Sequence, residues 1–218
     1  MFTLRKKVAL ILIILFAVIL AISSIVRYFF MDPVSTNLVL IELGFEMFTF
    51  QYELWNYAMY THIFSAAIAL LVGPIQFIKK FRTKNLALHR NLGKLYVISI
   101  AISASVGMYL SFYAFGGLTA MLGFFFLDIA WIITTYLAYY YIRKRNVHLH
   151  EQWMYRSYAV TFAAVTFRIW SAIIGYSTDN FILGYALATW LCWIGNLIVI
   201  EGYIRKKGQK QLTIEKAI

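Results

Sequence analysis

Residues 118–142 read LTAMLGFFFLDIAWIITTYLAYYYI, and Asp128 is the only charged residue among them. A helix that crosses a bilayer needs about 20 mostly apolar residues, and this stretch exceeds that length. It lacks the alternation of polar and apolar residues that the strands of a membrane β-barrel require. Arg143, Lys144 and Arg145 follow it directly. The stretch therefore predicts a transmembrane helix with a basic flank at its carboxyl end.

The composition of the whole chain fits a membrane environment. Of its 218 residues, 62% are hydrophobic and 13% are charged, whereas an average soluble domain is about 45–50% apolar and about 25% charged. A core of this size cannot hide so much apolar surface from water, which excludes an ordinary soluble enzyme. Cys192 is the only cysteine, so an intrachain disulfide scaffold is excluded as well.

Six segments are long and apolar enough to span a bilayer. They are residues 8–28, 57–78, 92–115, 118–142, 155–176 and 181–204. The first begins like a signal peptide, but its apolar run exceeds the about 7–15 residues of such peptides and no small-residue cleavage site follows, so we expect a retained helix. The predicted fold is an all-α polytopic membrane bundle of six transmembrane helices, with residues 1–218 as a single transmembrane domain.

The basic residues are distributed unevenly over the predicted loops. Of the 20 lysines and arginines, all except Arg27 and Arg168 precede the first span, follow the last, or lie between spans two and three or four and five, where Lys94 and Arg156 stand in the first residues of the following span. Because cytoplasmic loops carry an excess of lysine and arginine, both termini are predicted to be cytoplasmic. Topology and attraction to anionic lipid headgroups explain the formal charge of +11, so we expect no nucleic-acid partner.

Most of the predicted loops are short. Gly116 and Gly117 join spans three and four into a hairpin, and residues 177–180 do the same for spans five and six. The exception is the outer segment 29–56, in which large apolar residues recur at helical spacing. This segment is predicted to be either an interfacial amphipathic helix or an outward extension of the second span.

Two charged residues lie deep inside predicted spans, where charge is costly and marks functional candidates. Asp128 lies about ten residues from the outer end of the fourth span, and Arg168 about eight residues from the outer end of the fifth. Their similar depth, at 1.5 Å per residue, predicts a buried ion pair between neighbouring helices. Alternatively, Arg168 holds an anionic or carbonyl group of a ligand, such as a haem propionate or a quinone, because its guanidinium has donors to spare.

Four histidines are candidate metal or haem ligands. His89, His148 and His150 fall at the predicted cytoplasmic boundary, whereas His62 lies alone near the outer end of the second span. His89 and His150 form an inner site if spans three and five are neighbours, because imidazoles on facing helices hold haem or metal in bundles. A metal ion would need a third ligand there, such as His148, Met154 or Glu151. The alternative is that these histidines cap helix ends or contact lipid phosphates.

Other motifs restrict the function only weakly. The chain has no Walker loop, no Gly-x-Ser-x-Gly, no Cys-x-x-Cys and no His-Glu-x-x-His, so no familiar catalytic motif identifies an enzyme. Gly73 and Pro74 interrupt the second span, which predicts a kink, although broken helices also line sites in transporters.

Five short motifs carry a resemblance to a known family. They are Thr61-His-Ile, Gly73-Pro-Ile-Gln-Phe77, His89-Arg-Asn-Leu-Gly-Lys-Leu-Tyr96, His150-Glu-Gln-Trp-Met-Tyr-Arg-Ser-Tyr158 and Thr166-Phe-Arg168. Together they resemble an uncharacterised family of bacterial predicted integral membrane proteins, a domain of unknown function, over roughly residues 57–204. The resemblance implies a multi-pass protein of the bacterial cytoplasmic (plasma) membrane but no activity.

The resemblance also marks residues. It implies that the family's motif positions correspond here to His62, Gln76, His89, Arg90, Gly93, His150, Met154, Arg156 and Arg168. The layout, with histidines at opposite ends of a four-helix core, resembles di-haem b-type cytochromes and ferric-reductase-like membrane proteins as well. Paired histidines at each membrane face are missing, however, so an electron path through two haems is not expected.

The first functional hypothesis is a membrane redox protein. It would hold one haem b, or a transition metal, near the cytoplasmic face. His89 and His150 would be the ligands, and Arg90 or Arg156 would meet the propionates, with Arg168 as a further cofactor-binding candidate.

The second hypothesis is a small-molecule or proton-coupled carrier that uses His62, Asp128 and Arg168 in its outer half. The third is a non-catalytic assembly or partner-binding protein, in which all of these residues are structural. A quinone or another small molecule is the expected partner of a redox protein or carrier. The oligomeric state stays open, a homo-oligomer included.

Overall fold

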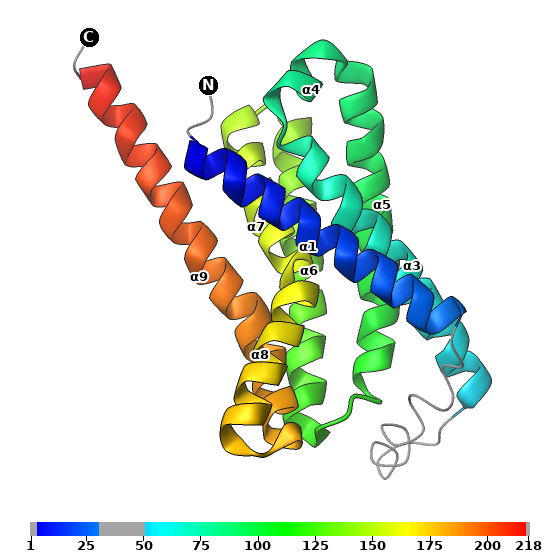
Figure 1. The fold of residues 1–218 in the computed structure, drawn as a ribbon. Coiled ribbons are helices and arrows are strands. Elements are labelled where there is room, and N and C mark those ends of the chain that lie inside the picture. Colours follow the sequence, from blue (N-terminus) through cyan, green and yellow to red (C-terminus); the bar gives the residue numbers. More distant parts are fainter. Residues whose placement is uncertain (1–3, 31–50, 217–218) are drawn as a thin grey trace.

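The computed structural model describes residues 4–30 and 51–216, and every secondary-structure element in these residues is a helix (Figure 1). The helices are α1 (Leu4–Phe29), α3 (Tyr52–Gln76), α4 (Lys79–Lys84), α5 (Leu86–Ser111), α6 (Gly117–Arg143), α7 (Val147–Thr161), α8 (Ala163–Thr178) and α9 (Phe181–Lys216). The predicted all-α fold is confirmed. Most of the outer segment 29–56 lies outside the described residues, and its last residues form the start of α3.

The helices agree with the predicted membrane spans. Five of them, α1, α3, α5, α6 and α9, are long and apolar enough to cross a membrane. α7 and α8 make a sixth crossing if they are counted as one span, and they are bent by 42° where Phe162 separates them. Five predicted spans are therefore confirmed as single helices, and the predicted span 155–176 is a bent helix pair.

A side chain from α9 lies at the bend between α7 and α8. The Asn196 amide donates to the carbonyl oxygen of Ala159, in the last turn of α7, and to Thr166 Oγ1, in the first turn of α8, both at 3.0 Å. Neither helix contains proline, and sharp bends without proline are typical where a side chain inserts into the backbone hydrogen-bond ladder. Asn196 therefore satisfies a carbonyl group at the bend and ties α9 to both halves of the span.

Gly73 and Pro74 lie near the end of α3. The helix continues through Pro74 and ends at Gln76, so the proline stands in the last turn and not in the middle of the span. Gly73 lies against the ring of Tyr158 from α7, with which an added Cβ would collide. The missing side chain thus lets α3 and α7 approach closely.

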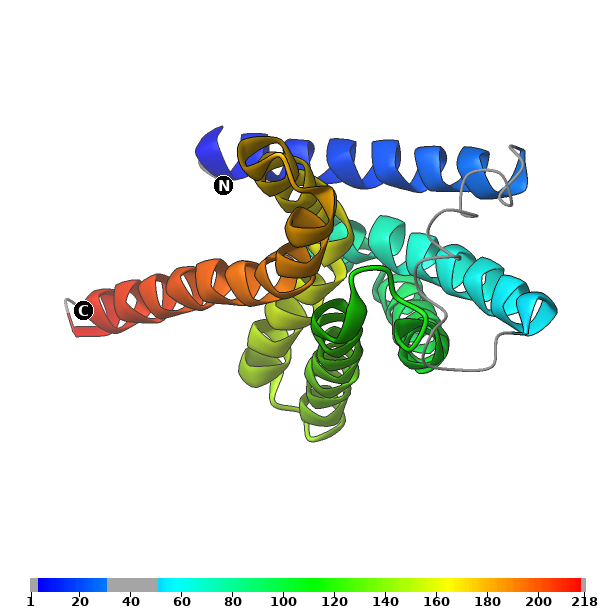
Figure 2. The same ribbon diagram turned by 90° about the horizontal axis from the view of Figure 1, so that it is seen from below.

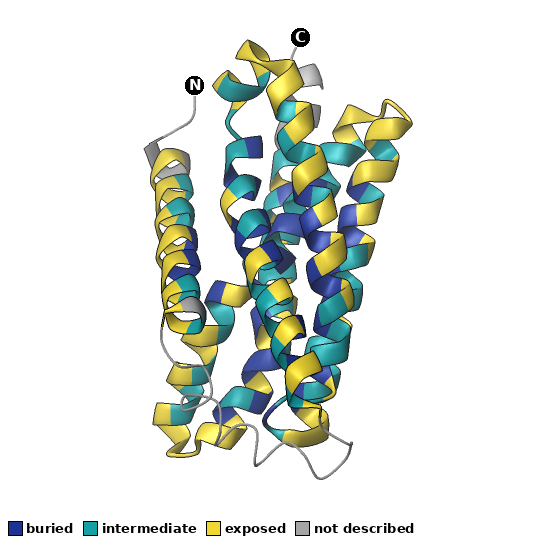
Figure 3. Ribbon diagram, turned by 90° about the vertical axis from the view of Figure 1, so that its right-hand side faces the viewer, coloured by how far each residue is buried: buried dark blue, intermediate teal, exposed yellow. Residues whose placement is uncertain are grey.

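The core lies between α3, α5, α6 and α7. α9 packs along α8, α6 and α7, while α1 crosses obliquely over α3 and α8 on one side (Figures 1 and 2). Buried positions line the inner sides of the helices and exposed positions cover their outer sides (Figure 3). Many exposed side chains are large and apolar, among them Ile11, Phe64 and Ile198. Lipid accommodates such faces better than water does.

The two ends of the bundle carry different connections. One end, here named the α4 end, holds α4 and the turn between α6 and α7. The opposite end holds the α5–α6 turn, where Gly116 and Gly117 have φ of 97° and 68°, and the α8–α9 turn, where Asp179 has φ of 49°. Glycine suits the first turn because it adopts positive φ without strain. Both predicted hairpins are present, and the cytoplasmic location of the α4 end stays a prediction from the basic residues.

Candidate functional site

Two of the predicted ligand residues lie at the α4 end. His89 is the fourth residue of α5, and His150 is the fourth residue of α7. Their imidazoles are close enough to interact electrostatically, and Arg82 of α4 acts on both. Both histidines are partly exposed. The structure thus places both of these histidines at the α4 end and His62, on α3, toward the opposite end.

Hydrogen bonds distinguish the two imidazoles. His150 donates from Nδ1 to the carbonyl oxygen of Ala138 at 2.8 Å, which leaves its Nε2 as a bare acceptor. Near His89, backbone groups orient the Gln76 amide: its oxygen accepts from the N–H of Gly93 at 3.1 Å, so its nitrogen donates to His89 Nδ1 at 2.5 Å. A neutral His89 therefore carries its proton on Nε2, the reverse of His150.

The opposite protonation of the two imidazoles argues against the predicted haem or metal site. A haem iron or metal ion between the two histidines needs a bare nitrogen from each. His150 offers one, but in His89 the amide of Gln76 occupies Nδ1 and a proton occupies Nε2. Among the residues whose side chains the structure describes, moreover, no three histidine, cysteine, aspartate or glutamate side chains form a group that could hold a metal ion. The geometry gives no support to this site.

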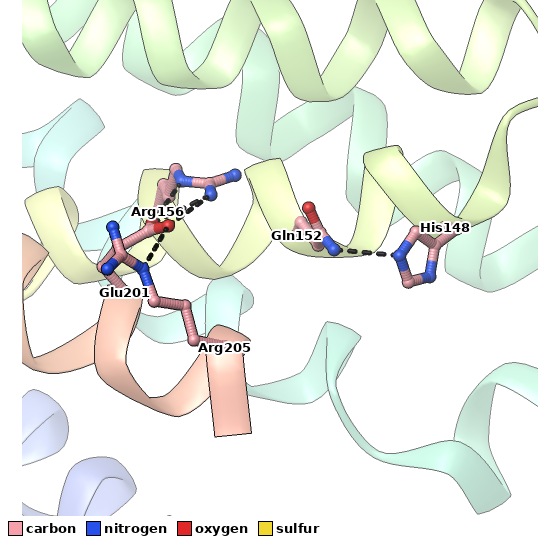
Figure 4. Close-up of polar contacts among 5 residues, drawn as sticks. All are labelled: His148, Gln152, Arg156, Glu201 and Arg205. Carbon is pink, nitrogen blue, oxygen red and sulfur yellow. Dashed lines mark hydrogen bonds and ion pairs between the residues drawn. The ribbon is translucent and has the colours of Figure 1, made fainter. Parts of the chain in front are cut away.

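His148 and Arg156 lie on the face of α7 that is turned toward α9. Figure 4 shows His148, Gln152 and Arg156 in a row along the helix, with Gln152 Nε2 donating to His148 Nε2 at 2.9 Å. Arg156 donates to both carboxylate oxygens of Glu201 in α9, at 3.0 and 3.2 Å. Arg156, which was predicted to bind a haem propionate, therefore binds the carboxylate of Glu201 instead. Arg90, the other arginine predicted to bind a propionate at this end, is exposed.

A cavity of about 490 Å³ lies toward the opposite end of the bundle. All of the described helices except α4 contribute to its walls. Most of its lining is apolar or aromatic, and four of the charged or titratable side chains that face it are His62, Asp128, Arg168 and Arg27. Small-molecule sites of about 300–1,000 Å³ with a few convergent polar groups have this character.

His62 is held in the cavity wall by α5. Its Nδ1 donates to the carbonyl oxygen of Ser103 at 2.9 Å, and Ser103 Oγ donates to the carbonyl oxygen of His62 at 3.1 Å. These reciprocal bonds fix the imidazole against the neighbouring helix. The Nε2 atom remains a bare hydrogen-bond acceptor.

Asp128 and Arg168 line this cavity but do not form the predicted ion pair. The Asp128 carboxyl, which is 3% exposed, packs against Gly107 of α5, and none of the ion pairs in the described residues includes it. Arg168 donates to the carbonyl oxygen of Ala164 at 2.7 Å and to Ser24 Oγ of α1 at 3.5 Å. The prediction was wrong because similar depth does not fix the direction in which each helix turns its side chains.

Buried hydroxyls lie next to the cavity in the centre of the bundle. Trp131 Nε1 donates to Thr161 Oγ1 at 2.8 Å, and the Tyr96 hydroxyl is 2.9 Å from both Thr161 Oγ1 and Ser157 Oγ. Thr135 Oγ1 continues the chain at 2.7 Å from Ser157 Oγ. Sequence reasoning missed this group. The available signal was the pair Ser157 and Thr161, four residues apart in a predicted span, with a further threonine in the fourth span.

One comparison with known proteins found a match. The family model described as "Predicted membrane protein (DUF2306)" matches residues 59–204. This range contains all of the predicted site residues, whereas α1 and the last part of α9 lie outside it. No curated protein and no solved structure matches the chain.

Proposed function

This chain belongs to the DUF2306 family of predicted membrane proteins, and we propose that it is a carrier that binds a small amphipathic molecule in the cavity opposite the α4 end. The proposal rests on the position of Asp128. Its carboxyl is 3% exposed in the wall of a cavity, without an ion pair from the described residues. Ionisable groups inside a membrane are costly, and they mark substrate or ion sites.

The polar groups of the cavity define the chemistry of the ligand. Asp128 and the Nε2 atom of His62 are acceptors, whereas the guanidinium groups of Arg168 and Arg27 are donors. Arg168 spends only part of its five N–H groups on Ala164 and Ser24. A molecule with a cationic or hydroxyl donor at one end and an anionic or carbonyl acceptor at the other satisfies both sets. Zwitterionic aromatic amino acids meet this description, and a quinol satisfies both sets in a related way, since one of its hydroxyls donates and the oxygen of the other accepts.

Equilibrium dialysis of the purified protein tests the proposal, with radiolabelled phenylalanine and a radiolabelled short-chain quinol as probes. We expect saturable binding of one probe. Asp128→Asn and Arg168→Gln should each weaken it by about tenfold or more, because a hydrogen bond to a charged group contributes about 1.5–3 kcal/mol.

The controls carry the same charge changes outside the cavity. Asp179→Asn, in the α8–α9 turn, and Arg205→Gln, on α9, should bind like the wild type, since neither residue lines the cavity. If neither probe binds at millimolar concentration, or the cavity variants bind as well as the controls, the proposal is refuted.

A redox function is the second proposal, and it rests on the hydrogen bonds of two histidines alone. His62 and His150 each donate from Nδ1 to a backbone carbonyl and keep Nε2 bare, which is the usual arrangement of metal-bound histidines. Absorbance spectroscopy and metal analysis of the purified protein test it. A Soret band or a stoichiometric metal that is lost in His150→Ala or His62→Ala, but kept in His89→Gln, supports this function. A sample without either refutes it.

The proposal also includes a membrane and an orientation. We propose that the protein resides in a bacterial cytoplasmic membrane with both termini and the α4 end inside, where the basic residues of α4 meet anionic headgroups. The support comes from the clustering of lysine and arginine on one side of the predicted spans.

A further inference from the structure

We infer that four buried hydroxyls, from Thr161, Tyr96, Ser157 and Thr135, form a proton path from the cavity toward the α4 end. Their oxygens follow one another at 2.9, 2.9 and 2.7 Å. The chain runs through α7, α5, α7 again and α6. Each of the four residues is at most 4% exposed. A continuous hydroxyl chain therefore crosses the packed centre of the bundle, where water has little access.

The pattern differs from that of hydroxyls with a purely local role. Ser and Thr side chains in membrane helices commonly bond to a carbonyl oxygen one turn earlier in their own helix. Thr134 does so with Ala130 at 2.7 Å, and Ser65 with Thr61 at 2.6 Å. Thr135, next to Thr134, bonds across the helix interface to another hydroxyl instead.

The hydrogen bonds between the four hydroxyls can run in either direction, as proton transfer requires. In one state Thr161 donates to Tyr96, Tyr96 to Ser157, and Ser157 to Thr135. In the reverse state each hydroxyl donates the other way, and the Thr161 hydroxyl turns to the Ser157 carbonyl oxygen at 2.9 Å. A hydroxyl has one donor and two acceptor positions, so each of the three links can point either way.

One transfer moves one proton without any net chemical change. In the proposed transfer, water in the cavity gives a proton to Thr161 Oγ1, each hydroxyl passes its own proton to the next oxygen, and Thr135 passes one to a water molecule that the path requires between Thr135 and the α4 end. The transfer leaves the chain in its reverse state. Rotation of the four hydroxyls then restores the starting state, and no oxidant or reductant is involved.

Groups that exchange protons line the cavity at one end of the path and lie within about one turn of α6 beyond its other end. Thr161 lines the cavity together with Asp128 and His62. At the other end, Thr135 stands about 4.5 Å along α6, three residues, before Ala138, and the Ala138 carbonyl accepts the Nδ1–H of His150. The bare Nε2 of the partly exposed His150 makes it the acceptor for water at that end.

Proton flux into liposomes tests the inference. The purified protein is reconstituted with pyranine inside the vesicles, and a potassium gradient with valinomycin sets an inside-negative potential. We expect internal acidification several-fold faster than in protein-free liposomes, without added ligand. Tyr96→Phe, which keeps the ring and removes one oxygen from the chain, should lower the excess rate at least tenfold, and Ser157→Ala likewise.

Tyr158→Phe is the matched control. Its buried hydroxyl donates to the carbonyl oxygen of Leu70 at 3.2 Å and takes no part in the chain, so this variant should conduct like the wild type. A wild-type rate equal to that of empty liposomes, wild-type conduction in Tyr96→Phe, or an equal loss in Tyr158→Phe overturns the inference. Thermal melts of both variants show whether they are equally folded.

The inference is separable from the proposed carrier function, although it uses the same cavity. Tyr96 does not line the cavity, so Tyr96→Phe should bind the dialysis probes as the wild type does. Flux that depends on Tyr96 without probe binding supports the path and refutes the carrier. Binding without flux supports the carrier and refutes the path.

Discussion

Gly73→Ala and Gly93→Ala are a matched pair with opposite expected effects on stability. Both glycines lie within helices, so each change gains about 0.5–1 kcal/mol of helix propensity. At position 93 an added Cβ has no atom within 4 Å, whereas at position 73 it collides with the Tyr158 ring and comes within 3.2 Å of the Tyr96 ring. Both tyrosines are buried, so the rings have little room to move.

The magnitude follows from these contacts. Overpacking a core costs about 1–3 kcal/mol. Displacing the Tyr158 ring also weakens the bond from its hydroxyl to Leu70, which contributes about 1 kcal/mol. After subtraction of the propensity gain, Gly73→Ala should lower the free energy of unfolding by about 2 kcal/mol. For a chain of this size that corresponds to a melting temperature about 4–8 °C lower.

The assay uses the buried thiol of Cys192, which is 0% exposed and reacts with a maleimide dye only on unfolding. Gly93→Ala should melt at or slightly above the wild-type temperature. If Gly73→Ala melts with the wild type, or if both variants lose stability equally, the close approach of α3 and α7 does not exist in this form.

Three further predictions concern other parts of the molecule. Asp128→Leu and Arg168→Leu should change the free energy of unfolding additively, within about 0.5 kcal/mol, since the two side chains share no partner. A coupling energy above about 1 kcal/mol in the double-mutant cycle would show that the two residues do form an ion pair. Asn196→Leu should cost about 1–3 kcal/mol in the same thermal melt, because it leaves a carbonyl oxygen at the bend without its donor, and a wild-type melt would exclude that role. Reporter fusions after Lys84 and after Arg145 should report the cytoplasm, and an external signal at either would reverse the proposed orientation.

The membrane spans were predictable because their signals are local. Twenty or more apolar residues specify a transmembrane helix wherever they stand, and Gly116 and Gly117 specify a turn through their own backbone freedom. The bend between α7 and α8 was not predictable in this way. It coincides with Asn196, which lies more than thirty residues away in the sequence and reaches the bend only after α9 has packed.

The candidate site was predictable in its residues but not in their partners. His62, Asp128 and Arg168 stood out as polar groups in apolar spans, and they do line one cavity. Their contacts depend on the rotation of each helix about its axis, which depth along the membrane does not determine. For the same reason, the sequence could not show that a side-chain amide takes the Nδ1 lone pair of His89 while a carbonyl takes the Nδ1–H of His150.

The boundary of the family match divides the cavity into two parts. Residues 59–204 supply His62, Asp128 and Arg168, whereas α1 lies outside that range and supplies Ser24 and Arg27 to the same wall. α1 packs mainly against α3 and meets α8 over a short stretch, with Ser24 in contact with Arg168 at 3.5 Å. Asp128 and His62, the acceptors proposed for the ligand, therefore belong to the matched region, and α1 adds a second cation and closes one side. The charge balance that selects an anionic or carbonyl group on the ligand accordingly depends on how α1 sits against α8.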